Sequence, residues 1–425
     1  MLQALLSGVA SIKAQQTRMN VIGNNLANVN TTAYKGTRAT FQEMIAQTIR
    51  GASGPRDSLG GTNPIQFGLG VLVAGTDTNN EQGSLQATNR PSDLAIQGNG
   101  FFMLSNSDRV AYTRDGGFDL DANGMLVQRA TGERLVGWSS NATGAIDTSQ
   151  PITPTSYISI PLGSLDAVQA TTDVQLKGNL NASAGASETW EVVTRVYDTL
   201  GGSHDIRMEF ANRSTPPGGT PPTGATSSWE WTAYEGTTVV GSSTTGTNER
   251  LYFDQNGNLL NPTVAGAISI PATGAAGTFD VNIDFERLSQ LNGENTVSTF
   301  SQNGFPPGSL QGFSIGADGS INGLFTNGLT RILGQIGMAI FSNPGGLERM
   351  GSNLWRNTDN SGIPVIGAPS TGGRGSINSG FLEQSNVDIG NEFTELIVTQ
   401  RGFQANTRVV TTVDEMLQEL INMKR

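Results

Sequence analysis

Two helical patterns at the ends of the chain constrain its fold most strongly. Near the carboxyl end, apolar residues recur seven apart, a period that fits an α-helix rather than a strand. The pattern predicts one helix from about Asp388 to about Met423, roughly 54 Å long at 1.5 Å per residue, with a capping-box start at Ser385-x-x-Asp388. The recurring residues are Leu396, Phe403, Val410 and Leu417.

The amino end carries a second apolar track of the same period, formed by Leu5, Ile12, Met19 and Leu26. Residues 1–30 contain Lys13 and Arg18 and no acid, a charge of +2, whereas residues 388–425 contain six acids against four bases, a charge of −2. Sustained heptads and complementary charge favour pairing of the two helices in a coiled-coil-like core. The alternative is that each helix docks separately on the central part of the chain.

The neighbouring track of each helix is poorly suited to a two-helix seam. It contains Gln16 and Gly23 in the first helix, and Gln400, Thr407 and Asp414 in the second. A pair would therefore leave half of its seam badly filled, and such helices are marginal alone. We expect the eight apolar residues of the two tracks to form a polymer interface with further copies of the chain.

Composition indicates a β-rich centre between these helices. The 425 residues are enough for two to four domains, and they include 55 glycines but only 14% charged residues, against about 25% in typical domains. Such a composition favours many short strands joined by tight turns. The net charge of −11 argues against nucleic acid or an anionic membrane as a partner.

The amino-terminal residues do not resemble a secretory signal. Leu2 to Ala10 is apolar but has no basic segment before it, and Lys13 follows without a small-residue cleavage site. No run of 18 apolar residues exists, so we expect no membrane insertion. We expect a protein that, if it is exported, keeps its amino terminus.

Local patterns divide the centre into short elements. Residues 31–50 have the spacing of a second, shorter helix (Phe41, Met44, Ile45, Ile49), and Gly51 to Gly61 is expected to be a linker. From Val71 the pattern is that of strands. Asn-Gly and Asp-Gly pairs predict hairpin turns, because glycine adopts the positive φ that such turns need. The predicted turn residues are Asn99 and Gly100, Asn123 and Gly124, Asn256 and Gly257, and Asp318 and Gly319.

The order of these helical and strand-like segments predicts a nested, mainly β fold with long α-helical termini. Paired terminal helices (1–30 and 386–425) form the core domain, and a connecting segment follows (31–75 and 362–385). An inner β domain comes next (76–145 and 298–361), and an outer β domain is inserted into it (146–297). Nesting implies that both ends of the chain lie together.

No pattern in the chain points to an enzyme, a cofactor or a metal. Cysteine is absent, and the single histidine, His204, is expected to be a surface residue of a turn beside Asp205. Asp119-x-Asp121-x-Asn123-Gly124 begins like a calcium loop, but Ala130 stands where a bidentate glutamate is required. No two carboxylates stand out as a glycosidase pair. We therefore name no catalytic, cofactor-binding or metal-binding residue.

Several strings resemble the bacterial flagellar axial proteins, and among them the flagellar hook proteins. At the amino end the string is Gln16 to Lys35, with Val21 to Thr31 at its centre, and at the carboxyl end it is Gln400 to Arg408 followed by Asp414 to Leu417. Further matches are Asp93 to Ile96, Gly98 to Phe102, Asn343 to Leu347, and Ser385 to Asp388. Together they cover about 1–145 and 300–425, and no such motif identifies the insert.

The resemblance implies a structural subunit that polymerises into the flagellar hook, a flexible tubular joint that transmits torque from the motor rod to the filament. It implies as partners further copies, the distal rod protein, the hook-filament junction proteins, the hook cap and the flagellar export apparatus. It also implies an extracellular place in the hook and basal body, and export without a cleaved signal peptide. The alternatives are a distal-rod-type protein, which resembles a shorter chain without the insert, and a secreted β-rich adhesin or surface enzyme.

Overall fold

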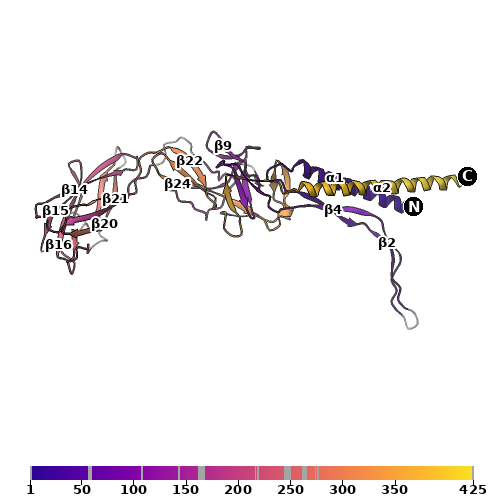
Figure 1. Ribbon diagram of the computed structural model, residues 1–425, viewed down its shortest axis with the longest axis horizontal. Helices are drawn as coiled ribbons and strands as arrows, with labels where there is room; N and C mark the ends of the chain where they lie inside the picture. Colours follow the sequence, from indigo (N-terminus) through magenta and orange to yellow (C-terminus); the bar gives the residue numbers. More distant parts are fainter. Residues whose placement is uncertain are drawn as a thin grey trace. The chain divides into compact units, whose positions relative to one another are not determined.

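The chain is mainly β, with one long helix at each end, as predicted (Figure 1). The computed structural model describes residues 2–55, 60–106, 109–141, 144–160, 168–215, 217, 220–243, 250–260, 266–272, 274 and 277–423. These residues divide into two compact units. The first comprises Met1–Ile160, Phe313–Asn322 and Ile332–Arg425, and the second comprises Pro161–Gly312 and Gly323–Arg331.

The terminal helices α1 (Leu2–Ala27) and α2 (Ile389–Asn422) lie side by side and antiparallel in the first unit (Figure 1). The start of α2 agrees with the sequence prediction to within one residue. The capping-box prediction is wrong, because the side chain of Asp388 itself accepts hydrogen bonds from the backbone N–H groups of Gly390 and Asn391. Such an N-cap satisfies two of the four orphan donors at a helix start.

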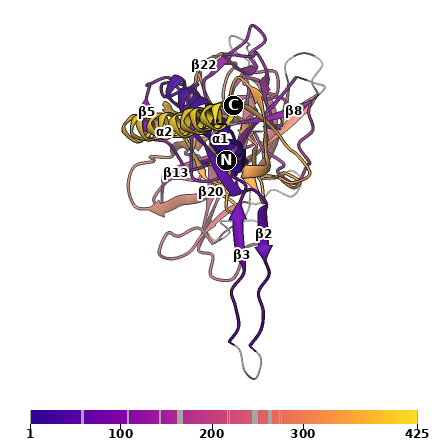
Figure 2. The same ribbon diagram turned by 90° about the vertical axis from the view of Figure 1, so that its right-hand side faces the viewer.

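Residues 31–50 form strands, so the predicted second helix is wrong. Strand β1 (Thr37–Glu43) pairs antiparallel with β4 (Val71–Thr78), and β2 (Ala46–Arg50) pairs with β3 (Ile65–Gly68). The expected linker Gly51 to Gly61 continues this β2–β3 hairpin, since Ser53 and Thr62 are bridged, although residues 56–59 lie outside the described part. The hairpin projects away from the helices (Figures 1 and 2).

Beyond the helices, the first unit is built on a nine-stranded sheet. Its main path is β26-β27-β8-β7-β11-β10-β9, and β25 pairs with both β28 and β7. Phe101, Tyr112 and Phe341 pack edge-on in its core. The strands are β7 (Phe101–Ser105), β8 (Val110–Thr113), β9 (Phe118–Leu120), β10 (Leu126–Gln128), β11 (Arg134–Leu135), β25 (Met338–Ile340), β26 (Glu348–Gly351), β27 (Leu354–Arg356) and β28 (Val365–Gly367).

Two small sheets join the segment before α2 to the first β segments. The segment therefore returns alongside residues 85–97 before α2 begins. Pairs are β29 (Ser376–Ser379) with β6 (Leu94–Gln97), and β30 (Phe381–Glu383) with β5 (Leu85–Ala87). A further sheet has the order β12-β24-β23-β22, with strands Gly137–Ser139, Thr330–Ile336, Ser320–Phe325 and Leu310–Ile315, and Pro344–Gly346 forms the short 3-10 helix η1.

The second unit is built from two facing β-sheets. Alternate residues of its strands are buried, as in β20, and they form one core around Phe210, Trp231 and Phe285. This alternation is the pattern of a β-sandwich. One sheet has the order β19 (Gly266–Pro271), β20 (Thr278–Leu291), β13 (Asp173–Asn181) and β21 (Ser298–Gln302). The other contains β14 (Trp190–Tyr197), β15 (Ser203–Ser214), β16 (Ser227–Glu235), β17 (Thr238–Ser242) and β18 (Leu251–Phe253).

The predicted turns differ in what they connect. Gly124 lies between the paired strands β9 and β10, and Gly257 lies just after β18; their φ angles are 75° and 80°. In both turns the aspartate three residues before the glycine organises the loop, because its carboxylate accepts backbone N–H groups. A hairpin at Asn99 and Gly100 is wrong: β6 and β7 belong to different sheets, so this turn links two sheets.

Candidate interaction surface on the terminal helices

Several contacts between α1 and α2 are made by small or polar side chains. A β-carbon placed on Gly8 would lie 3.0 Å from Val410 Cγ2, and Asn406 Nδ2 donates to Ser11 Oγ at 2.6 Å. Arg18 pairs with Glu395 at 3.1 Å. Partner positions rise along α1 as they fall along α2, which fixes the antiparallel direction. Small residues here let the two backbones approach closely.

The eight residues predicted as a polymer interface are not the fully buried residues of the two helices, and we call them the edge of the seam. All of them are partly exposed, and the residues buried on the helices are others, including Ala14, Ile22, Thr399 and Val413. The seven-residue track differs from the buried face of the helices for a simple reason. An α-helix has 3.6 residues per turn, so a strict seven-residue track drifts by about 20° per heptad relative to a straight seam. Of these eight residues, Val410 is the one that packs against Gly8 of α1.

Large apolar side chains on α2 remain uncovered on two other faces. Ile389, Phe393 and Ile397 are spaced four apart, and all three are exposed. Val409, Met416, Leu420 and Met423 follow at spacings of seven, four and three, so they share a second face. The seven-residue pattern does not include these residues, so it gave no sign that they would be exposed. Their one visible signal in the sequence is that they are apolar.

The end of α2 extends beyond the start of α1 (Figure 1). Gly8 faces Val410, and six residues of α1 precede Gly8. Because the helices are antiparallel and have the same rise per residue, these six can lie beside about six residues after Val410. Residues beyond about 416 therefore have no part of α1 beside them. Ile421 and Met423 are 70% and 83% exposed there. The last turn of α2 contains no basic residue among those described, and Glu419 lies close to it, although a helix carboxyl end favours cations.

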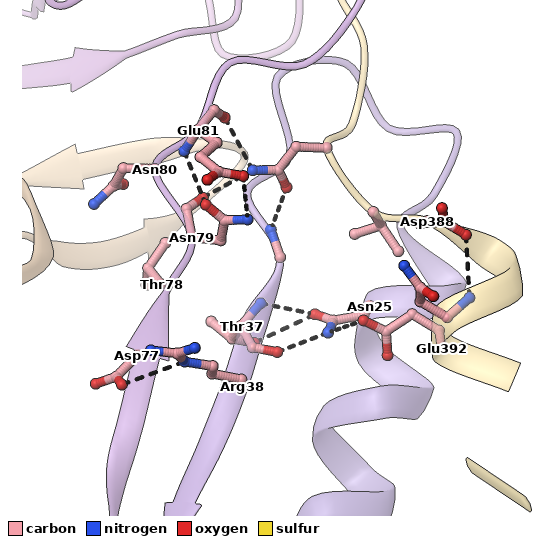
Figure 3. Close-up of a pocket in the computed structure, with 14 residues that line it drawn as sticks. Asn25, Thr37, Arg38, Asp77, Thr78, Asn79, Asn80, Glu81, Asp388 and Glu392 are labelled. Carbon is pink, nitrogen blue, oxygen red and sulfur yellow. Dashed lines mark hydrogen bonds and ion pairs between the residues drawn. The ribbon is translucent and has the colours of Figure 1, made fainter. Parts of the chain in front are cut away.

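Asn25 ties both helices to the β part of the first unit (Figure 3). Its side-chain NH2 group donates to Thr37 O at 2.7 Å and to Glu392 Oε1 at 2.9 Å. Its side-chain oxygen accepts from Thr37 N at 3.0 Å and from the Tyr34 hydroxyl at 3.2 Å. The residue is 2% exposed. Asn25 is therefore a buried hub inside α1.

A polar cavity of about 580 Å³ opens beside this hub. Asn386 lines this cavity and connects two of its walls. Its side-chain oxygen accepts from Gly36 N, and its NH2 group donates to Asn79 O and Glu81 O. Burial raises the pKa of Glu392, and the hydrogen bond from Asn25 offsets this in part. We call this set of contacts the helix joint, since it fixes the direction in which both helices leave the β part.

His204 is placed differently from the sequence expectation. It is the second residue of β15, its side chain is only 10% exposed, and its two ring nitrogens face the carboxylates of Asp198 and Glu235. Asp205, its neighbour in sequence, pairs instead with Arg195 at 2.8 Å. Burial alone would lower the pKa of His204, but the hydrogen bonds and charges of Glu235 and Asp198 together raise it above its ordinary value. The arrangement is a structural ion cluster.

Among the described residues, no group of three or more histidines, aspartates and glutamates is placed to hold a metal ion. Within the same residues, no helix is both long enough and apolar enough to cross a membrane. Neither the helix joint nor the exposed faces of α2 present a nucleophile with an activating base. The exposed apolar side chains of α2 are the feature of this surface that the structure does show.

Four family models match the chain, and all describe flagellar proteins. "Flagella basal body rod protein" matches residues 5–35, and "Flagellar hook protein FlgE/F/G D1 domain" matches 95–181. "Flagellar basal body protein FlaE D2 domain" matches 164–305, and "Flagellar basal body rod FlgEFG protein C-terminal" matches 378–423. These matches place the chain in the class of flagellar rod and hook proteins, and they include the insert that carried no recognisable motif.

Relatives that match over the full length show which flagellar proteins the chain is similar to. The flagellar hook protein FlgE of Borreliella burgdorferi is 36% identical over 456 residues, which cover all of both chains. FlgE of Escherichia coli is 33% identical over 99% of this chain and 100% of its own. A solved structure, Helicobacter pylori FlgE2, is 16% identical with a TM-score of 0.47 and covers 70% of this chain and 100% of its own. The chain belongs to the flagellar hook protein FlgE family.

The chain is accordingly a structural subunit of the bacterial flagellar hook, and not an enzyme. One expectation about the insert needs correction. The flagellar basal-body rod protein FlgG of Bacillus subtilis is 31% identical over 426 residues that cover all of both chains. A rod protein of this length exists, so the presence of the insert does not by itself separate hook from rod proteins.

Proposed function

We propose that the terminal helices of many copies associate into a coiled-coil-like core, and that this association builds the hook as a flexible tube. The observation that carries the proposal is the apolar surface that α1 leaves uncovered on α2, above all Phe393, Ile397, Met416 and Leu420. Large exposed apolar patches commonly mark protein interaction sites. Burying one such side chain contributes roughly 1.5–3 kcal/mol, and each added subunit would bury several.

The eight residues at the edge of the seam belong to the same proposed interface. All eight are partly buried in the single chain, and each retains surface that a further copy can bury. The interface would then consist of the exposed faces of α2 together with this edge. The edge residues are Leu5, Ile12, Met19, Leu26, Leu396, Phe403, Val410 and Leu417.

Flexibility is proposed to reside outside this core. We propose a nested order, with the outer domain at about 146–297, whose contacts with neighbouring copies slide as the tube bends. The separate compact unit of Pro161–Gly312 supports an insert of about this extent. Wet interfaces with few dominant residues permit such rearrangement. The family resemblance adds as proposed partners the distal rod protein, the junction proteins, the hook cap and the export apparatus, with export that leaves the amino terminus in place.

Assembly of purified variants tests the proposal. Ile397→Glu and Phe403→Glu each place a charge where the polymer would exclude water, and an unpaired buried charge is costly. We expect both variants to remain as folded monomers under conditions in which the unsubstituted chain forms tubes in electron micrographs. Gln404→Glu, on the same helix but outside the apolar faces, is the matched control and should assemble. Normal tubes from Ile397→Glu and Phe403→Glu would exclude the helices as the interface.

A further inference from the structure

A buried cluster in the first unit holds two cations against one carboxylate. Glu383, which is 1% exposed, accepts from Lys35 Nζ at 2.6 Å and from Arg114 Nη1 at 3.5 Å. Lys35 and Arg114 are 3% and 5% exposed. Lys35 also donates to Glu81 O, and Arg114 donates to Gly98 O. Backbone carbonyls supply partial negative charge only, so the cluster carries an excess of one positive charge.

The environment does not neutralise this excess. Burial lowers the pKa of Lys35 and outweighs the raising effect of Glu383, and burial likewise lowers the pKa of Arg114. Arg349 adds a further cation nearby, since its guanidinium donates to the carbonyl of Lys35. Arg114 Nε is buried and has no hydrogen-bond partner, a costly condition for a charged donor. Both cations would be stabilised by a second anion.

Lys35 and Arg114 also line one cavity, of about 290 Å³. Its other walls include the apolar side chains of Phe101, Ile340 and Phe341. Among the described residues, none of those that line this cavity is acidic. A site with cations at one side and apolar walls suits a carboxylate on a short hydrocarbon stem, since guanidinium and ammonium donors form strong charge-assisted bonds with carboxylates.

We propose that this cavity binds a carboxylate, namely an aspartate or glutamate side chain from a second copy of the chain. The proposal rests on the polymer proposed above and adds a specific contact within it. Acids are abundant on such a partner, with 36 Asp and Glu against 25 Lys and Arg. A free carboxylate ion shares the same chemistry, so the experiment separates the two sources.

The first arm uses the full-length monomer labelled with ¹⁵N-arginine. Sodium acetate is titrated against sodium chloride at equal ionic strength, and the arginine Nε–Hε signals are followed by NMR. The Arg114 signal is assigned by its absence from Arg114→Lys. We expect it to shift with acetate and to saturate, while the signal of Arg356, whose ion pair with Glu348 is exposed, stays unchanged. No shift at Arg114 would overturn carboxylate binding.

The second arm uses tubes assembled from two pools of subunits, one labelled with ¹⁵N-arginine and the other with ¹³C-carboxylate Asp and Glu. Solid-state dipolar dephasing then reports only contacts between copies. We expect dephasing at the Arg114 nitrogens and none at those of Arg356. Tubes without dephasing at Arg114 would overturn the second copy as the source, and an acetate shift in the first arm would then assign the site to a free carboxylate. Failure of the unsubstituted chain to form tubes would overturn the proposed polymer itself, a distinct result.

Discussion

Gly8 of α1 faces Val410 of α2 so closely that a β-carbon at Gly8 would lie 3.0 Å from Val410 Cγ2. This separation is shorter than an ordinary van der Waals contact between carbons. The two helices of one chain therefore touch through the smallest residue available. A short approach of this kind fixes the spacing of the two helices at this point.

The first prediction concerns this contact. Gly8→Leu should push the helices apart, because overpacking costs about 1–3 kcal/mol and exceeds the gain of about 1 kcal/mol from replacing a helical glycine. We expect amide exchange along α1 to speed up roughly tenfold in the monomer. Gly23→Leu is the matched control, since the space around Gly23 is open, and it should slow exchange slightly. Val410→Ala should restore slow exchange to Gly8→Leu; if it does not, the clash lies elsewhere.

A second prediction concerns the helix joint. Asn25→Ala removes five hydrogen bonds and leaves partly buried groups of Thr37 and Glu392 without these partners. We expect a loss of about 1–3 kcal/mol in local stability, seen as faster exchange in α1 and in the first turns of α2. Asn24→Ala removes an exposed side chain on the same turn and should change little. Equal effects of the two variants would show that Asn25 is not the hub.

The sequence predicted the parts of the fold that depend on local pattern. Helix α2 begins within one residue of the prediction, because its period persists for more than thirty residues. The spacing of Phe41, Met44, Ile45 and Ile49 is short, and short apolar runs fit a helix or a strand equally. Pairing with residues 65–78 decided in favour of strands, and no local signal encodes that pairing.

The candidate surface was predicted in part. The sequence identified the helices correctly, but the exact faces depend on which residues the partner helix covers, and Gly8, Ser11 and Asn406 carry no hydrophobic signal. The cluster of Lys35, Arg114 and Glu383 was beyond reach for another reason. Lys35 and Glu383 lie 348 residues apart, so only the folded chain brings them together. The partners of His204 were missed likewise, since Glu235 lies 31 residues away.

The third prediction is a pH dependence in the second unit. Glu235 and Asp198 raise the pKa of His204 in the folded chain above its ordinary value of 6.5. The charged ring therefore stabilises the fold fully at pH values below 6.5. That stabilisation is lost as the pH rises through the raised value. We expect the protection factors of residues 198–210 in the full chain, which exclude the intrinsic pH dependence of amide exchange, to fall as the pH rises through this raised pKa, by an amount equivalent to about 1–2 kcal/mol. His204→Gln should lack this dependence, and a parallel dependence in that variant would assign it to another group.

The fourth prediction concerns removal of the insert, and the structure indicates where to cut. Gln169 and Phe305 form an antiparallel bridge, with Phe305 N donating to Gln169 O at 2.8 Å. The ends of a deletion of 170–304 are therefore already adjacent, and a two-glycine linker can join them. Both residues lie in the second unit, so the helices, the helix joint and the nine-stranded sheet keep all their residues.

We expect this shortened chain to fold and to form tubes, because the proposed interface lies on the terminal helices. The tubes should differ in curvature from those of the full chain, since the sliding contacts proposed for the outer domain would be missing. Electron micrographs measure both properties on the same sample. The control is the shortened chain carrying Ile397→Glu, which should form no tubes. If the shortened chain folds, as judged by slow exchange in β7 and β8, yet never assembles, the outer domain is part of the assembly interface and the proposed division between a stiff core and a compliant exterior is wrong.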